Sequence, residues 1–480
     1  MIERIKGLAS RASEHFFFVG ATVISAGVHF LYSVFVKAHI EPLEYGIYST
    51  CLLLQTYMTY AQLGSLNAFN RDYPQLVGAG EKEKAKKYRN TTFTFLLVAF
   101  GTATILISLA VLVIGRGRDS RYTFGLVLCA VITTVTIFEN YLASRVRIDG
   151  DFKYTSFVVL AELVSVGIGF VLISKIGYYG LYIVTIGSML MGIGLYYKKG
   201  ISDLTLSIDK TLLKTIILSG IPLLVNNLIW TVVNSIDKFV ILGFINTEAL
   251  GVYSIAQMAF SYMVLIPNAM SQLFYVRLGK VYGATKSVDE LNDKAMKYTL
   301  ILAVVVSFIV ICAYFFMGPL VGWIMPRYSG GVPSAQILML GLAIYAPTMV
   351  NSNILTILKK NAALLRGSVY LCIMNIICSV GLVIMRGASI ENVALGTTIS
   401  YLIRTIILVI QLKRNANTKA WKMISASIVP VMISAGPGFI IYHLVENRVI
   451  GFCISVAFAA TVVLVGYGRD IISLIRGGRE

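Results

Sequence analysis

The stretch PLLVNNLIWTVVNSIDKFVIL, Pro222 to Leu242, is long and apolar enough to cross a bilayer as one helix, which takes about 20 mostly apolar residues. It nevertheless carries a proline, three asparagines and an adjacent aspartate–lysine pair. Because a helix turns by about 100° per residue, its polar positions fall on one face. That face carries Asn227, Trp230, Asn234, Asp237 and Lys238. A charge in the bilayer centre costs at least about 2.5 kcal/mol, so we expect this face to meet protein or a water-filled cavity.

The composition of the whole chain indicates a membrane protein. Of its 480 residues, 57% are hydrophobic and 13% are charged, whereas soluble domains carry roughly 25% charged residues. The mean hydropathy is +0.78. We predict an all-α polytopic fold whose spans cover fourteen apolar runs: 16–37, 46–70, 91–114, 122–143, 155–174, 177–197, 216–242, 251–272, 298–320, 333–357, 367–386, 390–411, 423–442 and 449–467.

The distribution of lysine and arginine predicts the topology, because these residues accumulate in cytoplasmic loops. With the N-terminus inside, the tails and the even-numbered loops hold 31 of the 41 basic residues and the odd-numbered loops hold 9, while Arg404 lies within the twelfth span. We therefore predict a plasma (inner) membrane protein with both termini cytoplasmic. The net charge of +18 is explained by short basic loops, which argues against a nucleic-acid partner and leaves membrane lipids as the surroundings.

A repeated motif divides the chain into related halves. PLEYGIYS (Pro42–Ser49) aligns with TEALGVYS (Thr247–Ser254), 205 residues later, and each motif follows a polar-faced helix and opens the next one. Two six-helix repeats in parallel orientation are typical of two-lobe transporters, although a short string can also recur by chance. We predict an N-lobe at 1–200, a C-lobe at 201–412 and additional C-terminal helices at 413–480.

Polar faces recur in spans 1, 2, 7 and 8, which hold equivalent positions in the two repeats. The residues predicted to line a substrate cavity are His29, Gln55, Gln62, Asn227, Trp230, Asn234, Gln257, Tyr401 and Arg404. The alternative for each is interhelical hydrogen bonding, which polar residues in membranes commonly provide. The guanidinium of Arg404 suits a phosphate group, and Glu162 and Asp237 are candidates for ion coupling. For Glu162 and Arg404, a mutual ion pair is the structural alternative.

No motif predicts a catalytic centre, a metal or a cofactor. The six cysteines lie in apolar runs without a C-x-x-C pair, and the four histidines lack metal-ligand spacing. The phosphate-loop motif G-x-x-x-x-G-K-[ST] is absent, so ATP hydrolysis by that chemistry is excluded. A membrane-embedded glycosyltransferase or polymerase would need large external loops, and the odd-numbered loops are short. We therefore expect a transporter rather than an enzyme.

These residues resemble the Wzx-type polysaccharide flippases, a branch of the MOP exporter superfamily that also contains the MATE antiporters and the lipid II flippases. The most specific part is SGIPLLVNNLIWTVVNSIDKFVILGFINTEALGVYSIAQMA (Ser219–Ala259), supported by LEYGIYS, QLGSLNAFNRDYPQ and RIDGDFKYTS. The resemblance implies two six-helix lobes around a central cavity, two C-terminal helices and alternating access.

The resemblance also implies the substrate, a polyprenyl-diphosphate-linked oligosaccharide flipped to the external leaflet for polysaccharide or O-antigen biosynthesis. Partners would then include the polysaccharide polymerase and the chain-length machinery. Cationic cavity residues are expected in such a flippase, yet Arg404 is the only basic residue deep in a span, which is a departure from the family. The alternative is a MATE-type cation-coupled multidrug antiporter, in which Glu162 or Asp237 would hold the cation.

Overall fold

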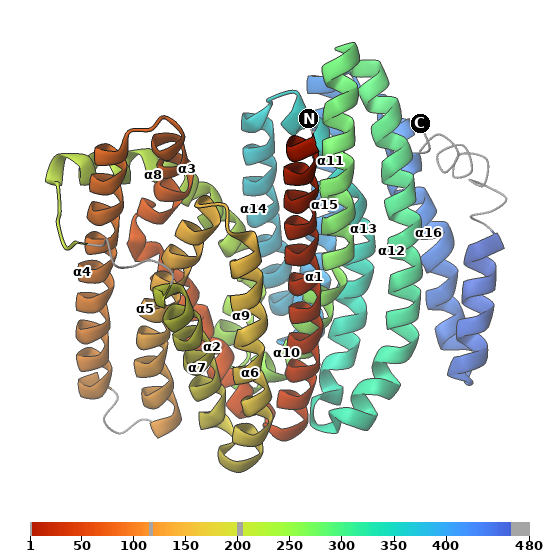
Figure 1. The fold of residues 1–480 in the computed structure, drawn as a ribbon. Coiled ribbons are helices and arrows are strands. Elements are labelled where there is room, and N and C mark those ends of the chain that lie inside the picture. The colour runs from red at the N-terminus through yellow and green to blue at the C-terminus, as the bar shows by residue number, and fades with distance from the viewer. Residues whose placement is uncertain (1, 115–118, 199–204, 462–480) are drawn as a thin grey trace. The chain divides into compact units, whose positions relative to one another are not determined.

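The computed structural model describes residues 2–114, 119–198 and 205–461. Within these ranges the secondary structure is helical and includes no strand (Figure 1). Twelve of the described helical segments are long and apolar enough to cross a membrane. The predicted all-α polytopic membrane fold is therefore confirmed.

Two of the fourteen predicted spans are not among these twelve. Residues 46–70 form α2 (Pro42–Met58), the 3₁₀ turn η1 (Thr59–Gln62) and α3 (Ser65–Gly78) in place of the single helix expected there, so that expectation is wrong. The last predicted span, 449–467, begins as the shorter apolar helix Arg448–Thr461 and continues beyond the described residues.

The chain forms two compact units, residues 1–228 and 229–480, and the boundary falls inside a helix. In the first unit α5 packs against α2, α4 and α7, and α6 packs against α1 and α7. Besides α2, η1 and α3, this unit contains α1 (Ile2–His39), α4 (Lys82–Ile114), α5 (Ser120–Ile148), α6 (Phe152–Ile176), α7 (Tyr178–Lys198) and most of α8 (Lys210–Val233).

The second unit has α13 and α15 at its centre. The helix α15 packs against α13 and α14, whereas α13 also contacts α10 and α12, and α16 lies along α12 (Figure 1). The elements are α9 (Ile236–Phe244), α10 (Thr247–Met263), α11 (Leu265–Thr285), α12 (Val288–Ile324), η2 (Pro326–Gly331), α13 (Val332–Ile357), α14 (Asn361–Arg386), α15 (Ile390–Ala416) and α16 (Ala420–Leu444). The predicted lobe boundaries at residues 200 and 412 stay predictions.

The second span of each predicted repeat is interrupted. In the first unit the chain passes between η1 and α3 through Leu63 (φ 50°) and Gly64 (φ 81°), a left-handed conformation that glycine adopts at little cost. In the second unit α10 and α11 meet at Val264. Pro267 follows three residues later and lacks a backbone donor, which explains a break at this point. The repeat offset of 205 residues maps the start of η1 onto Val264, so the two breaks occupy equivalent positions.

A close crossing fixes the start of α8 against α3 in the first unit. A Cβ added at Gly220 would overlap the backbone of Gly64, so both glycines are needed for this approach. Beside the crossing, Nη1 of Arg71 donates to the carbonyl oxygen of Ser219 at 3.4 Å. The Ser219 hydroxyl donates to Asp72, also at 3.4 Å. The motifs QLGSLNAFNRDYPQ and SGIPLL, far apart in the sequence, therefore pack directly against each other.

Candidate functional site

A polar cavity of about 390 Å³ lies inside the second unit, between the end of α8 and the helices α9, α10, α13 and α15. Ligand-binding cavities in proteins commonly range from about 300 to 1,000 Å³. Four residues predicted from the sequence line it together: Asn234, Asp237, Gln257 and Tyr401. Lys238, Ser261 and Thr397 add further polar groups to the wall.

A break in the seventh predicted span shapes this cavity. The single helix expected from Pro222 to Leu242 is wrong, because α8 ends at Val233 and α9 begins at Ile236. The proline does not cause the break, since α8 runs through Pro222. Instead the hydroxyl of Ser235 donates to the carbonyl of residue 231 at 2.7 Å, a local bond that competes with regular helix geometry. The break places Asp237 in the first turn of a new helix, where the helix dipole favours a negative charge.

The carboxylate of Asp237 is the centre of a cluster of oxygen atoms. It accepts hydrogen bonds from the Tyr253 hydroxyl at 2.5 Å and from the Thr397 hydroxyl at 2.6 Å. Oδ1 of Asn375 lies 3.1 Å from the same threonine hydroxyl and 2.9 Å from that of Ser379. Carboxylate, amide and hydroxyl oxygens are the ligands that hard cations prefer. This cluster is therefore the arrangement in the second unit that suits a small cation.

Close packing of α14 on α15 brings this cluster together. A Cβ added at Gly396 would lie 2.5 Å from the Cα of Ser379, so the two backbones approach as closely as they do because residue 396 is glycine. Asn375 and Ser379 stand one turn apart on α14, and Thr397 directly follows the glycine on α15. The glycine contact thus sets the distance between the oxygen atoms of the two helices.

Aromatic rings form the wall of the cavity next to α15. The ring of Tyr401 stacks between those of Phe260 and Tyr345, with centroid distances of 5.9 and 4.7 Å. Tyr401 is buried, and Phe260 also lines the cavity. The stack gives the cavity a flat, rigid wall on one side.

Arg404 lies one turn beyond Tyr401 on α15 and is not among the residues that line this cavity. It is 6% exposed, and its guanidinium lies against α14 at Gly367, where an added Cβ would come within 2.8 Å of Cζ. Its Nη1 donates to Oε1 of Gln411 at 3.4 Å. Among the described residues it has no carboxylate within ion-pair distance. The sequence predicted a deep cation correctly, and its role in binding substrate stays a prediction.

The site residues predicted in the first unit do not share a described cavity. His29 is exposed on α1, and Nε2 of Gln55 donates to the Thr136 hydroxyl at 3.4 Å. Gln62 lies in η1, where its buried Oε1 has no hydrogen-bond partner among the described atoms. Gln55 therefore matches the interhelical alternative, whereas Gln62 keeps an acceptor free.

The helix α8 carries the remaining predicted residues. Asn227 and Trp230 are both exposed, and Trp230 is 38% accessible. They do not line the cavity of the second unit, which begins at Val233. Their predicted contact with substrate stays a prediction.

Glu162 of α6 pairs with Glu139 of α5 inside the first unit. Their carboxyl groups are hydrogen-bonded to each other, and both face Gly192 of α7, where an added Cβ would lie 2.5 Å from an oxygen of Glu162. Two carboxylates in contact repel each other, so such a pair holds a shared proton. The arrangement can store or release one proton within a membrane-spanning helix pair.

Sequence reasoning missed Asn375 and Ser379. The available signal was their spacing of four residues in an otherwise apolar stretch, CIMNIICSVGL, which puts both on one helix face. It also treated Glu139 and Glu162 separately, because their contact arises only when α5 packs near α6 and α7.

The fold is shared with solved membrane transporters. Lipid II flippase MurJ in an inward closed conformation matches with a TM-score of 0.72 and 18% identity, over 95% of this chain and 100% of that chain. An inward-facing multidrug resistance MATE family transporter of the MOP superfamily matches with 0.67 and 16%, over 82% and 95%. The Vibrio cholerae MATE transporter VcmN gives 0.56 and 15%, over 86% and 99%. These matches show that the chain has a MATE-like fold.

A comparison with curated protein sequences gives no match. A family model described as polysaccharide biosynthesis protein matches residues 39–304, which is more than half of the chain. The matched region includes both copies of the repeated motif, the α3–α8 crossing, Asp237 and Gln257. The chain belongs to this family of polysaccharide biosynthesis proteins.

Proposed function

We propose that the chain is a flippase for polyprenyl-diphosphate-linked oligosaccharide repeat units. The observation that carries this proposal is the polar cavity around Asp237 within a chain that is otherwise strongly apolar. Polar groups inside a membrane-spanning unit are costly unless they meet a polar ligand, water or each other. Family membership in polysaccharide biosynthesis and the fold shared with a lipid II flippase support a lipid-linked saccharide as that ligand.

The chemistry of the cavity wall fits the headgroup of such a lipid. The ammonium of Lys238 and the amides of Asn234 and Gln257 are hydrogen-bond donors suited to phosphate and sugar oxygens. The aromatic stack at Tyr401 offers an apolar face of the kind that packs against sugar rings. Arg404, buried one turn further along α15, would receive a phosphate after a rearrangement of the rings.

Export by alternating access needs a source of free energy, and the sequence has no phosphate-loop motif for ATP. We propose that an ion gradient supplies it through Asp237, whose oxygen cluster suits a hard cation, and through the shared proton of Glu162. Cation binding at Asp237 would neutralise the carboxylate beside Lys238 and free the ammonium for an anionic headgroup. The cycle forms and breaks no covalent bond, in keeping with a transporter rather than an enzyme.

The proposed setting is the plasma (inner) membrane, with both termini in the cytoplasm. The exported units would pass to the polysaccharide polymerase and the chain-length machinery. This topology follows from the distribution of lysine and arginine, 31 against 9. Impermeant labelling of single cysteines placed in odd-numbered and even-numbered loops of intact cells tests it, because only odd-numbered loops should react.

Deletion of the gene tests the proposed transport. Lipid-linked glycans are extracted from the deletion strain, and their leaflet is determined in inverted and right-side-out vesicles. We expect complete repeat units to accumulate on the cytoplasmic leaflet and surface polysaccharide to decline, with both effects reversed by the wild-type gene. Normal surface polysaccharide and an unchanged lipid-linked pool would contradict the proposal.

The second candidate is a MATE-type cation-coupled multidrug antiporter. The oxygen cluster around Asp237 supports it, because such an exchanger needs a cation site within one unit. The same deletion strain decides between the two functions. Unchanged lipid-linked glycans together with raised sensitivity to cationic drugs would favour the antiporter.

A further inference from the structure

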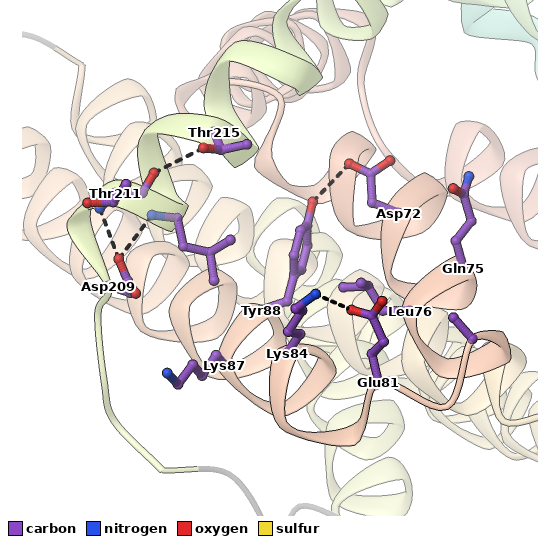
Figure 2. Close-up of a pocket in the computed structure, with 12 residues that line it drawn as sticks. Asp72, Gln75, Leu76, Glu81, Lys84, Lys87, Tyr88, Asp209, Thr211 and Thr215 are labelled. Carbon is purple, nitrogen blue, oxygen red and sulfur yellow. Dashed lines mark hydrogen bonds and ion pairs between the residues drawn. The ribbon is translucent and has the colours of Figure 1, made fainter.

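A second cavity, of about 670 Å³, lies in the first unit at the junction of α3, α4 and α8 (Figure 2). It is distinct from the cavity around Asp237, and none of the residues predicted from the sequence to contact substrate lines it. Its wall contains carboxylates, ammonium groups, an amide and hydroxyls above an apolar floor of Leu76, Ala79 and Leu212. The loop between α3 and α4 beside it belongs to the segment GAGEKEKAKKYRN, which the distribution of basic residues assigns to the cytoplasm.

The upper wall of the cavity is fixed by hydrogen bonds. Tyr88 donates from its hydroxyl to Oδ2 of Asp72 at 3.2 Å, which holds the ring in the middle of the wall (Figure 2). Arg71 holds the same carboxylate through Nε and Nη2, at 2.5 and 3.0 Å. These hydrogen bonds lower the pKa of Asp72 below its ordinary value, so the residue is a carboxylate at neutral pH. A wall held in this way loses little freedom when a ligand binds.

The α8 side of the cavity is fixed as well. Asp209 caps α8 by accepting the backbone N–H groups of Thr211 and Leu212 on Oδ1, each at 3.0 Å. The backbone N–H of Asp209 donates to the hydroxyl of Thr91 on α4 at 3.3 Å. Two residues earlier, the backbone N–H of Ser207 donates to another α4 hydroxyl at 3.1 Å. The segment leading into α8 is therefore bound along α4, and the cavity keeps its shape without an occupant.

The charges of the lining residues narrow the class of ligand. Three carboxylates, Asp72, Glu81 and Asp209, face two ammonium groups, Lys84 and Lys87, so the net charge is −3 + 2 = −1. Lys84 is already paired with Glu81 at 2.8 Å (Figure 2). A phosphate or an anionic lipid headgroup would therefore meet more negative than positive charge. A cation would in turn meet the unpaired ammonium of Lys87.

The hydrogen-bonding groups point to an uncharged ligand rich in hydroxyls. Carboxylates only accept hydrogen bonds, lysine ammonium groups only donate them, and an amide does both. Gln75 presents an amide that makes no side-chain hydrogen bond to another described residue. A sugar satisfies such a mixed wall, because each hydroxyl donates and accepts while the C–H faces of the ring pack on an apolar floor. We propose that this cavity binds the saccharide portion of the substrate on the cytoplasmic side, a step that rests on the proposed flippase function.

The two cavities would then act on different parts of one substrate. The first unit would hold the oligosaccharide at the water-facing end of α3, α4 and α8, where sugars remain hydrated. The cavity of the second unit would receive the charged headgroup within the membrane. The saccharide site would thus select the repeat unit before the lipid is flipped.

The test uses the full-length protein purified in detergent and two probes. The first probe is the free oligosaccharide released by mild acid from the lipid-linked pool, which carries no phosphate. The second probe is inorganic diphosphate. Saturation-transfer NMR reports which probe contacts the protein.

The pocket-filling variant is Thr215→Trp, because Thr215 is exposed on α8 and lines the cavity. Lys214→Trp is its matched control on the adjacent exposed position outside the cavity. Gln75→Ala removes the free amide, and Val77→Ala, also exposed on α3, is its control. The second pair keeps the test decisive if the tryptophan variant does not fold.

We expect saturation transfer to the sugar protons in the wild type and in both controls, with the affinity about tenfold lower in Thr215→Trp and about two- to tenfold lower in Gln75→Ala. No transfer in the wild type, or transfer that neither pocket variant reduces, would overturn the inference. Diphosphate binding that the tryptophan blocks would overturn it too, because the site would then be an anion site.

Failure of this inference differs from failure of the proposed function. If the deletion strain accumulates lipid-linked repeat units but the free oligosaccharide does not bind, the saccharide site alone is wrong. If the oligosaccharide binds in this cavity while the deletion strain exports polysaccharide normally, the site stands and the flippase function is wrong.

Discussion

Replacing Asp237 by asparagine separates a role in transport from a role in the fold. The carboxylate accepts hydrogen bonds from Tyr253 at 2.5 Å and from Thr397 at 2.6 Å. Hydrogen bonds to charged groups contribute about 1.5–3 kcal/mol each. The asparagine keeps one acceptor oxygen, and the Thr397 hydroxyl can turn to Oδ1 of Asn375, 3.1 Å away. We therefore expect the free energy of unfolding to fall by only ~1–3 kcal/mol.

Transport should fall much further than stability in this variant. If Asp237 holds the coupling cation, asparagine leaves neutral oxygens around the site. A unit charge pair 4 Å apart interacts by about 4 kcal/mol at an effective dielectric constant of about 20. Losing that interaction corresponds to an affinity about a thousandfold weaker. We expect cation-dependent export to be abolished although the protein still reaches the membrane.

The assay is complementation of the deletion strain, with surface polysaccharide, leaflet distribution of lipid-linked glycans and membrane abundance measured on the same cells. Asp293→Asn is the matched control, because Asp293 has a side chain 63% exposed and lies 3.7 Å from Lys422, away from the cavity. Wild-type export by Asp237→Asn would refute the coupling role. A fall in abundance parallel to the fall in export would show that Asp237 serves the fold.

Three further substitutions test other contacts. Gly220→Ala places a methyl group against the backbone of Gly64 and should lower the free energy of unfolding by ~1–3 kcal/mol, seen as a lower melting midpoint in detergent, whereas Gly279→Ala, which meets open space, should not. Arg404→Ala should reduce export at unchanged membrane abundance, and a parallel loss of both would make Arg404 structural. Glu162→Gln keeps a hydrogen-bonding side chain beside the neighbouring carboxyl but removes a proton site, so the dependence of export on external pH should weaken; an unchanged pH profile would count against proton coupling.

The helical architecture could be predicted from the sequence because bilayer thickness sets the length of an apolar run. The helix interruptions could not be placed in the same way, because apolar length is insensitive to them. In span 7 the proline suggested a bend at Pro222, but the helix ends twelve residues later at Asn234 and Ser235. A side-chain hydrogen bond made in the folded chain decides the position. In span 8 the proline signal at Pro267 did indicate the break.

The candidate site was partly predictable because helical periodicity shows which residues share a face. Asn234, Asp237 and Gln257 were selected in this way and line one cavity. Periodicity does not show which faces meet, so it also selected Gln55, whose amide bonds to a neighbouring helix. Asn375 escaped because its position beside Asp237 depends on a glycine-mediated approach of two later helices.

The two repeats differ at the position that matters most for coupling. The offset of 205 residues maps Asp237 onto Tyr32 and Tyr253 onto Tyr48, so an acid–phenol pair in the second unit corresponds to two phenols in the first. The helix also differs, because α1 is continuous from Ile2 to His39 and offers no helix N-terminus at that depth, whereas α9 begins at Ile236. A cation site of the Asp237 type requires both the carboxylate and the oxygen atoms that converge at the break. The first unit lacks this carboxylate and this break, so any ion coupling there must use different chemistry, and the carboxyl pair of Glu139 and Glu162 provides it.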